Sequence, residues 1–160
     1  MHPFRRLAVW QKGHELALAT YRATEGVSYR RFPGLADQLR RAVCSIPANV
    51  AEGSGRDTPE QFAHFLEIAI GSAREVDYLL QLAADLEAIA RSDHAKLEAR
   101  NDQVCRMLVA LRATIRERAL SKRTRTRTRA TQPREQAEGD GGRKVSRTLA
   151  SRPVSATPSR

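Results

Sequence analysis

The chain has 160 residues, 41% of them hydrophobic, and a formal net charge of +10 at pH 7. This length suits one domain with a single core. No apolar run approaches the ~20 residues that a membrane-spanning helix needs, and the N-terminal residues do not read as a signal peptide. We therefore expect a cytoplasmic protein without a membrane partner.

The first two helices are indicated by apolar spacing, and no stretch shows the sustained alternation of a strand. The first is predicted over residues 6–25, where one face carries Trp10, Gly13, Ala17 and Tyr21. Glycine and proline residues end it in a loop that reaches Gly34. The second is predicted over residues 35–52. Because Pro47 lacks the N–H that would bond the Val43 carbonyl, we expect a kink there, with Ser45 or Asn49 bonding the freed backbone groups.

The third and fourth helices have clearer signals. Thr58-Pro59-Glu60-Gln61 is a capping box with proline at the first helical position, and the apolar stripe that follows runs to about Ile89. Ser92 is the expected cap of the fourth helix. Steps of three and four residues typical of a bundle seam then join Leu97, Asn101, Val104, Leu108, Leu111 and Ile115.

The pattern stops after Leu120, and the charge changes there too. Residues 121–160 hold 11 Lys and Arg against 3 Asp and Glu, whereas residues 1–120 hold 17 against 15. With few aliphatic residues to bury, residues 121–160 are predicted to be a disordered, arginine-rich tail. Residues 1–120 are predicted to fold as an all-α protein, an antiparallel up-down-up-down four-helix bundle with mostly short connections.

The sequence resembles the bacterial four-helix-bundle family first noted as open reading frames inside intervening sequences of 23S ribosomal RNA. The resemblance covers about residues 4–118. It includes Val9-Trp10-Gln11-Lys12, but its strongest part is the block from Ser45 to Arg56, with Ser45, Ile46, Pro47, Asn49, Glu52 and Gly53 as the family motif. The long tail departs from the family, so the resemblance implies nothing about its role.

The resemblance implies a bundle that assembles with copies of itself as a ring, typically a homopentamer, with no catalytic activity established for the family. Accessory proteins of diversity-generating retroelements look similar and are thought to bind reverse transcriptase and nucleic acid. By analogy, the chain is expected to bind RNA or DNA or a protein partner.

The residues themselves give no support to an enzyme, a cofactor or a metal centre. Glu60, His64 and Glu67 have no second copy of a di-iron motif, and a surface ion pair is the simpler interpretation. Cys44 and Cys105 lack metal spacing and are expected to be reduced, partly buried thiols. The Ser45–Arg56 block is open to two interpretations: a binding surface around Pro47, or residues that set helix geometry, which we favour.

The basic residues give the leading functional hypothesis. In an up-down-up-down bundle, three parts of the chain lie at the same pole: the start of the first helix, the turn between the second and third helices, and the end of the fourth helix. That pole and the tail therefore share the candidate nucleic-acid-binding residues: Arg5, Arg6, Arg56, Arg112, Arg116, Arg118, Lys122, Arg123, Arg125, Arg127 and Arg129. We expect non-catalytic binding of RNA or DNA through phosphates. The alternative is a ring-shaped scaffold that binds a protein partner, with the tail incidental.

Overall fold

The computed structural model describes residues 3–28 and 30–131, and this part of the chain contains helices without any strand. A short 3-10 turn, η1 (Pro3–Arg6), precedes α1 (Ala8–Ala23). The other helices are α2 (Leu35–Ser54), α3 (Pro59–Asp85) and α4 (Arg91–Thr131). The predicted all-α fold class is confirmed.

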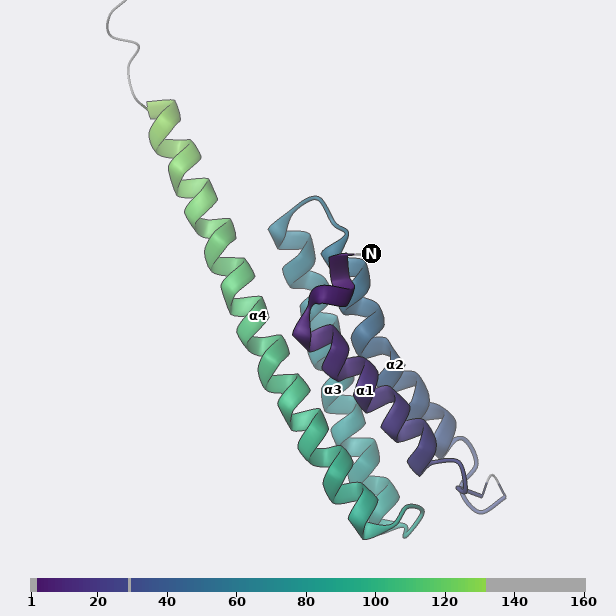
Figure 1. The fold of residues 1–160 in the computed structure, drawn as a ribbon. Coiled ribbons are helices and arrows are strands. Elements are labelled where there is room, and N and C mark those ends of the chain that lie inside the picture. The colour runs from purple at the N-terminus through teal and green to yellow at the C-terminus, as the bar shows by residue number, and fades with distance from the viewer. Residues whose placement is uncertain (1–2, 29, 132–160) are drawn as a thin grey trace, which may run out of the picture.

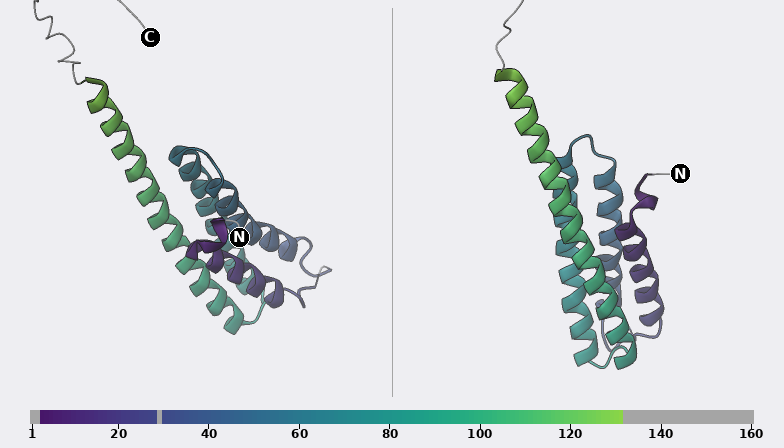
Figure 2. Two further views of the ribbon diagram at one scale, coloured as in Figure 1. Left: turned by 45° about the horizontal axis from the view of Figure 1, so that its top comes forward. Right: turned by 60° about the vertical axis from the view of Figure 1, so that its left-hand side comes forward.

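The four helices form an antiparallel bundle in which each packs against its neighbours in sequence, and α4 also packs against α1. We call the end that holds η1 and the α2–α3 turn the N-terminal pole. Figure 1 shows that α4 passes this pole and continues beyond the other helices, and both views of Figure 2 agree. None of the described helices is apolar enough over a sufficient length to cross a membrane.

The core is built from aliphatic side chains that recur at the predicted helical spacing. Its largest fully buried members come from all four helices and include Leu16, Leu39, Ile46, Leu66, Leu80 and Leu108. Each such side chain contributes about 1.5–3 kcal/mol by leaving water. One predicted position is wrong: Tyr21 is 46% exposed, whereas Thr20 is fully buried. Thr20 is tolerated there because its hydroxyl donates to the Leu16 carbonyl at 2.9 Å.

α2 is a single helix through Pro47, which is buried against α1. An added Cβ at Gly13 would lie 3.6 Å from the Pro47 ring, so the two helices approach closely at this point. The Asn49 side-chain amide donates to the Ser45 carbonyl at 2.8 Å. This acceptor is not the Val43 carbonyl that Pro47 leaves free, so the predicted role of Asn49 is not confirmed.

The Thr58 hydroxyl caps α3 as predicted, accepting the Gln61 N–H at 3.2 Å. The other end was predicted less well, because α3 stops at Asp85 instead of about Ile89. Glu87 adopts a left-handed φ of 53°. The N–H groups of Glu87 and Ala88 then bond the carbonyls of Ala84 and Ala83 at 3.0 and 2.8 Å, which completes a Schellman motif.

Both predicted limits of α4 need correction. The helix begins at Arg91, so Ser92 lies inside it, and the Ala90 carbonyl accepts the first N–H groups, those of Asp93 and His94. The helix also continues to Thr131, so the predicted boundary at residue 120 falls within it. Arginine and lysine are good helix formers, and cations are favoured near a helix C-terminus. The rest of the tail predicted over residues 121–160, residues 132–160, lies outside the described residues.

Gly53 marks a close approach of α2 to α3. A Cβ at this position would lie 2.7 Å from the Phe65 Cβ and 2.8 Å from the Phe62 ring. We expect Gly53→Ala to lower the free energy of unfolding by about 1–3 kcal/mol, because one helix must move. Urea denaturation measures this. Gly71→Ala is the matched control: a Cβ there meets nothing within 4 Å, so alanine should stabilise the helix by about 0.5–1 kcal/mol. Equal effects at both positions would contradict the close approach.

Glu87 is the second test of local geometry. A left-handed conformation costs a non-glycine residue roughly 1–2 kcal/mol. Glu87→Gly should therefore raise the free energy of unfolding by about 0.5–1 kcal/mol, measured by thermal and urea denaturation. Glu98, exposed within α4, provides the control, since Glu98→Gly should lose a similar amount. A loss at both positions would show that α3 does not end in this motif.

Candidate nucleic-acid interface

The central part of the family motif links α2 to α3 by hydrogen bonds. The Ser45 and Ser72 hydroxyls lie 2.9 Å apart, and the Ser72 hydroxyl also donates to the Ile68 carbonyl at 3.1 Å. The Asn49 amide nitrogen lies 3.0 Å from the Ser45 hydroxyl, as well as bonding the Ser45 carbonyl. This network is partly buried, so it leaves few of these polar groups for a ligand.

The remaining motif residues divide between the core and the surface. Ile46, Pro47 and Gly53 are buried. Glu52 is exposed and forms an ion pair with Arg56. The Arg56 guanidinium also lies over the Phe65 ring, 4.7 Å from its centroid. The contacts in this structure therefore favour the structural interpretation of the motif over a binding surface.

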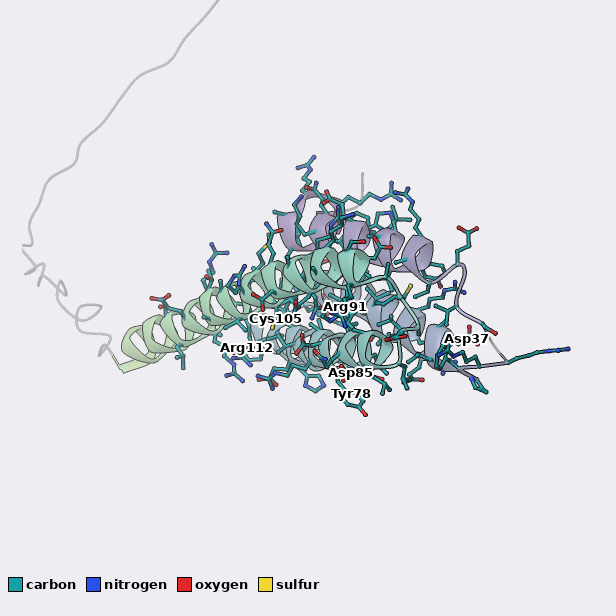
Figure 3. All side chains as sticks on the ribbon, turned by 90° about the horizontal axis from the view of Figure 1, so that it is seen from below. Asp37, Tyr78, Asp85, Arg91, Cys105 and Arg112 are labelled. Atoms are coloured by element: carbon teal, nitrogen blue, oxygen red, sulfur yellow. The ribbon has the colours of Figure 1, made fainter. Side chains whose placement is uncertain are left out.

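The structure brings the predicted arginines to one pole but engages several of them with acids. Arg112 and Arg116 of α4 both reach Glu67 of α3, and the Arg112 contact is 3.8 Å. Figure 3 shows Arg112 beside α3, seen along the bundle from below. The remaining cations of the described pole, Arg5, Arg6 and Arg118, are exposed and have no carboxylate partner among the described side chains.

The other predicted cations occupy the part of α4 that projects from the bundle. Lys122, Arg123, Arg125, Arg127 and Arg129 all belong to the helix that ends at Thr131. We call residues 121–131 the α4 extension. It contains five basic residues and no acidic residue. The extension continues past the N-terminal pole, beyond the end of α3 (Figure 2).

A cavity of about 320 Å³ lies between α3 and α4 at the same pole. Its lining is Glu60, Ala63, His64, Glu67, Arg116, Ala119 and Leu120. Among the described residues, no three His, Cys, Asp or Glu side chains gather as a metal site would require. Glu67 is occupied by Arg116, so the cavity combines apolar walls with an internally paired charge.

Sequence reasoning missed an aromatic stack at the pole. The Trp10 and His14 rings are 5.2 Å apart and stacked, with an interplanar angle of 8°, and the Phe4 ring lies 4.9 Å from the indole at an angle of 58°. Trp10 is half-buried and His14 is exposed. The spacing of Trp10 and His14, four residues apart in a predicted helix, is a signal that could have suggested the pair.

Two side chains of α1 have shifted pKa values, and neither shift favours acid–base chemistry near pH 7. The hydrogen bond from Lys12 lowers the pKa of the Glu15 carboxyl. The hydrogen bond between the Tyr21 hydroxyl and the Cys44 thiol raises the pKa of Tyr21. The two groups are 3.9 Å apart, and Cys44 is exposed rather than partly buried as predicted, while Cys105 is half-buried. The contacts therefore stabilise the form that each group already has at pH 7, which is the carboxylate of Glu15 and the neutral hydroxyl of Tyr21.

The model of the 23S rRNA-intervening sequence protein family matches residues 5–110. The chain belongs to this family. None of the curated proteins matches the chain.

Among solved structures, the chain is similar to a protein of unknown function from the S23 ribosomal protein family of Bacteroides thetaiotaomicron VPI-5482. The two are 24% identical, with a TM-score of 0.61 over 65% of this chain and 97% of that one. This likeness establishes the shared fold of the bundle. The α4 extension lies beyond the residues that the family model matches.

The Ser45–Ser72 hydrogen bond gives a prediction for the family motif. Ser45→Ala and Ser72→Ala should each destabilise the protein by about 1 kcal/mol, and the double variant should show a coupling energy of about 0.5–1.5 kcal/mol. Urea denaturation of the four proteins measures the cycle. Ser54 bonds only the nearby Ala51 carbonyl, so a Ser54–Ser72 cycle should be additive. Additivity in both cycles would mean that the hydroxyls do not join the two helices.

Proposed function

We propose that this protein binds nucleic acid without catalysis, through the basic N-terminal pole and the α4 extension. The observation that supports this most is the projection of α4 past the bundle. Its last eleven residues carry five basic side chains and no acidic one. A folded, projecting rod of positive charge suits a phosphate backbone, whose negative charges are closely spaced.

The sequence of the extension also places like charges one helical turn apart. Arg123 and Arg127 are four residues apart in the helix, as are Arg125 and Arg129. Like charges at this spacing destabilise a helix by a few tenths of a kcal/mol per pair. Bound phosphates would remove this repulsion and release their counterions, and both effects favour binding.

The rest of the pole adds fewer contacts than the sequence suggested. Arg56, Arg112 and Arg116 already have acidic partners, so binding a phosphate through them would require those pairs to open. Arg5, Arg6 and Arg118 are exposed and carry no such cost. We therefore assign the main contact to the extension and an accessory contact to these three arginines.

Self-association is a further part of the proposal. A ring of copies would present several extensions together, and their combined avidity would exceed that of one extension. Ile68 and Tyr78 of α3 and Leu86, which follows it, are exposed by 40, 65 and 41%, and Figure 3 shows Tyr78 pointing away from the bundle. These exposed apolar side chains also support the second candidate function, a scaffold that binds a protein partner.

The proposal is tested by comparing two variants that remove the same number of positive charges, one at each pole of the bundle. Arg123, Arg125, Arg127 and Arg129 are changed together to glutamine, which retains helix propensity. The control changes Arg22, Arg30, Arg31 and Arg91, four exposed arginines at the opposite pole, in the same way. Binding of single-stranded RNA and duplex DNA by the full chain is measured at several salt concentrations. The extension variant should bind more weakly and lose roughly 3 units of the slope of log K against log salt.

The outcomes separate the candidate functions. An unchanged slope in the control variant would assign the phosphate contacts to the extension. Equal losses in both variants would mean that only net charge matters, which contradicts a defined interface. If the unmodified chain binds neither nucleic acid near physiological salt, the proposal fails. The scaffold candidate then leads. Its first requirement, self-association of the chain, is measured by sedimentation of the full chain at increasing concentration.

A further inference from the structure

The aromatic stack beside η1 ends in an exposed ring, that of His14, which burial in the core does not explain. Phe4 and Trp10 pack η1 against α1, and Trp10 also contacts the core. His14 lies one turn farther along α1, exposed, with its ring parallel to the indole. Its imidazole has no hydrogen-bond or ion-pair partner among the described residues. His14 therefore stacks on the indole toward solvent and adds little to the core, whereas the Phe4 ring packs on Trp10 at an angle of 58°.

The surroundings of this stack combine rings with cations. Arg5 and Arg6 are exposed at the Phe4 end. Farther along α1, Tyr21 is 46% exposed, and the Arg40 guanidinium lies over its ring at 5.0 Å. From Trp10 to Tyr21 the helix rises roughly 16 Å, which is enough for a few nucleotides. Aromatic rings interleaved with cations are the usual means of binding single strands, because bases stack on the rings while cations hold the phosphates.

We propose that the stacked Trp10 and His14 rings, with Phe4 packed at an angle beside them, are a platform for the unpaired bases of single-stranded nucleic acid, with Arg5 and Arg6 holding the adjacent phosphates. This inference rests on the proposed function and narrows it. The α4 extension contains no aromatic residue, so it can hold a strand only by its phosphates. The stack supplies the contact that the extension lacks, and it makes the protein prefer single strands to duplexes, whose bases are already paired and stacked.

The test is the affinity of the full chain for a short single-stranded oligonucleotide, as RNA and as DNA, and for a blunt duplex. His14→Ala should weaken single-strand binding about 5- to 150-fold, the usual effect of removing one stacking ring. It should leave the salt slope and duplex binding unchanged, since no phosphate contact is lost. His14→Phe should restore single-strand binding. His64, an exposed histidine whose ring lies 6.0 Å from that of Phe65, is the control, and His64→Ala should have no effect.

A second measurement needs no variant. Trp10 is the single tryptophan of the chain, so its fluorescence reports on the stack. A normal oligonucleotide should change this fluorescence, whereas an abasic strand of equal length should bind through its phosphates without the same change. If single strands bind with a steep salt slope but His14→Ala has no effect and both strands give the same signal, the platform is wrong and the proposed function stands. Absence of all binding would overturn both.

Discussion

The close approach of α2 to α3 at Gly53 is the constraint on which the N-terminal pole depends. With no Cβ at this position, the last turn of α2 lies directly against Phe62 and Phe65. The turn that follows is short, and the Thr58 cap starts α3 at once. α3 then carries α4 along its length, so the place where α4 leaves the bundle follows from this contact. A bulkier residue would displace the surface that presents the basic extension.

The bundle itself was largely predictable, because burial of apolar stripes and the Thr58 cap are both visible in the sequence. The ends of α3 and α4 were not. α3 ends through a left-handed Glu87, and glutamate gives no sign of that conformation, whereas glycine would have. The extension was misjudged for a different reason. Low apolar content argues against a core, but a helix that is already nucleated propagates on backbone hydrogen bonds and needs none.

The location of the candidate site was predictable from the sequence, but the ion pairs that engage some of its arginines were not. Chain topology was enough to place the arginines at one pole, and the structure agrees. Their partners could not be read from sequence, because Arg116 and Glu67 are 49 residues apart and meet only when α4 packs on α3. The aromatic stack depends likewise on η1, which turns Phe4 back onto Trp10. A charge count treats all arginines alike, whereas ion pairs divide them into available and occupied groups.

One buried residue connects stability to the position of the extension. Asn101 lies in the seam of α4 and is 3% exposed; its amide donates to the Ala73 carbonyl at 2.9 Å, while its Oδ1 has no partner. A buried acceptor without a partner costs about 1–3 kcal/mol, so leucine would suit this core better. What the polar side chain adds is a directional bond to one backbone group of α3. A slide of α4 by one turn would break this bond. Asn101 therefore lowers stability but fixes the position of α4 along α3. That position determines how far the basic end of α4 projects beyond the bundle.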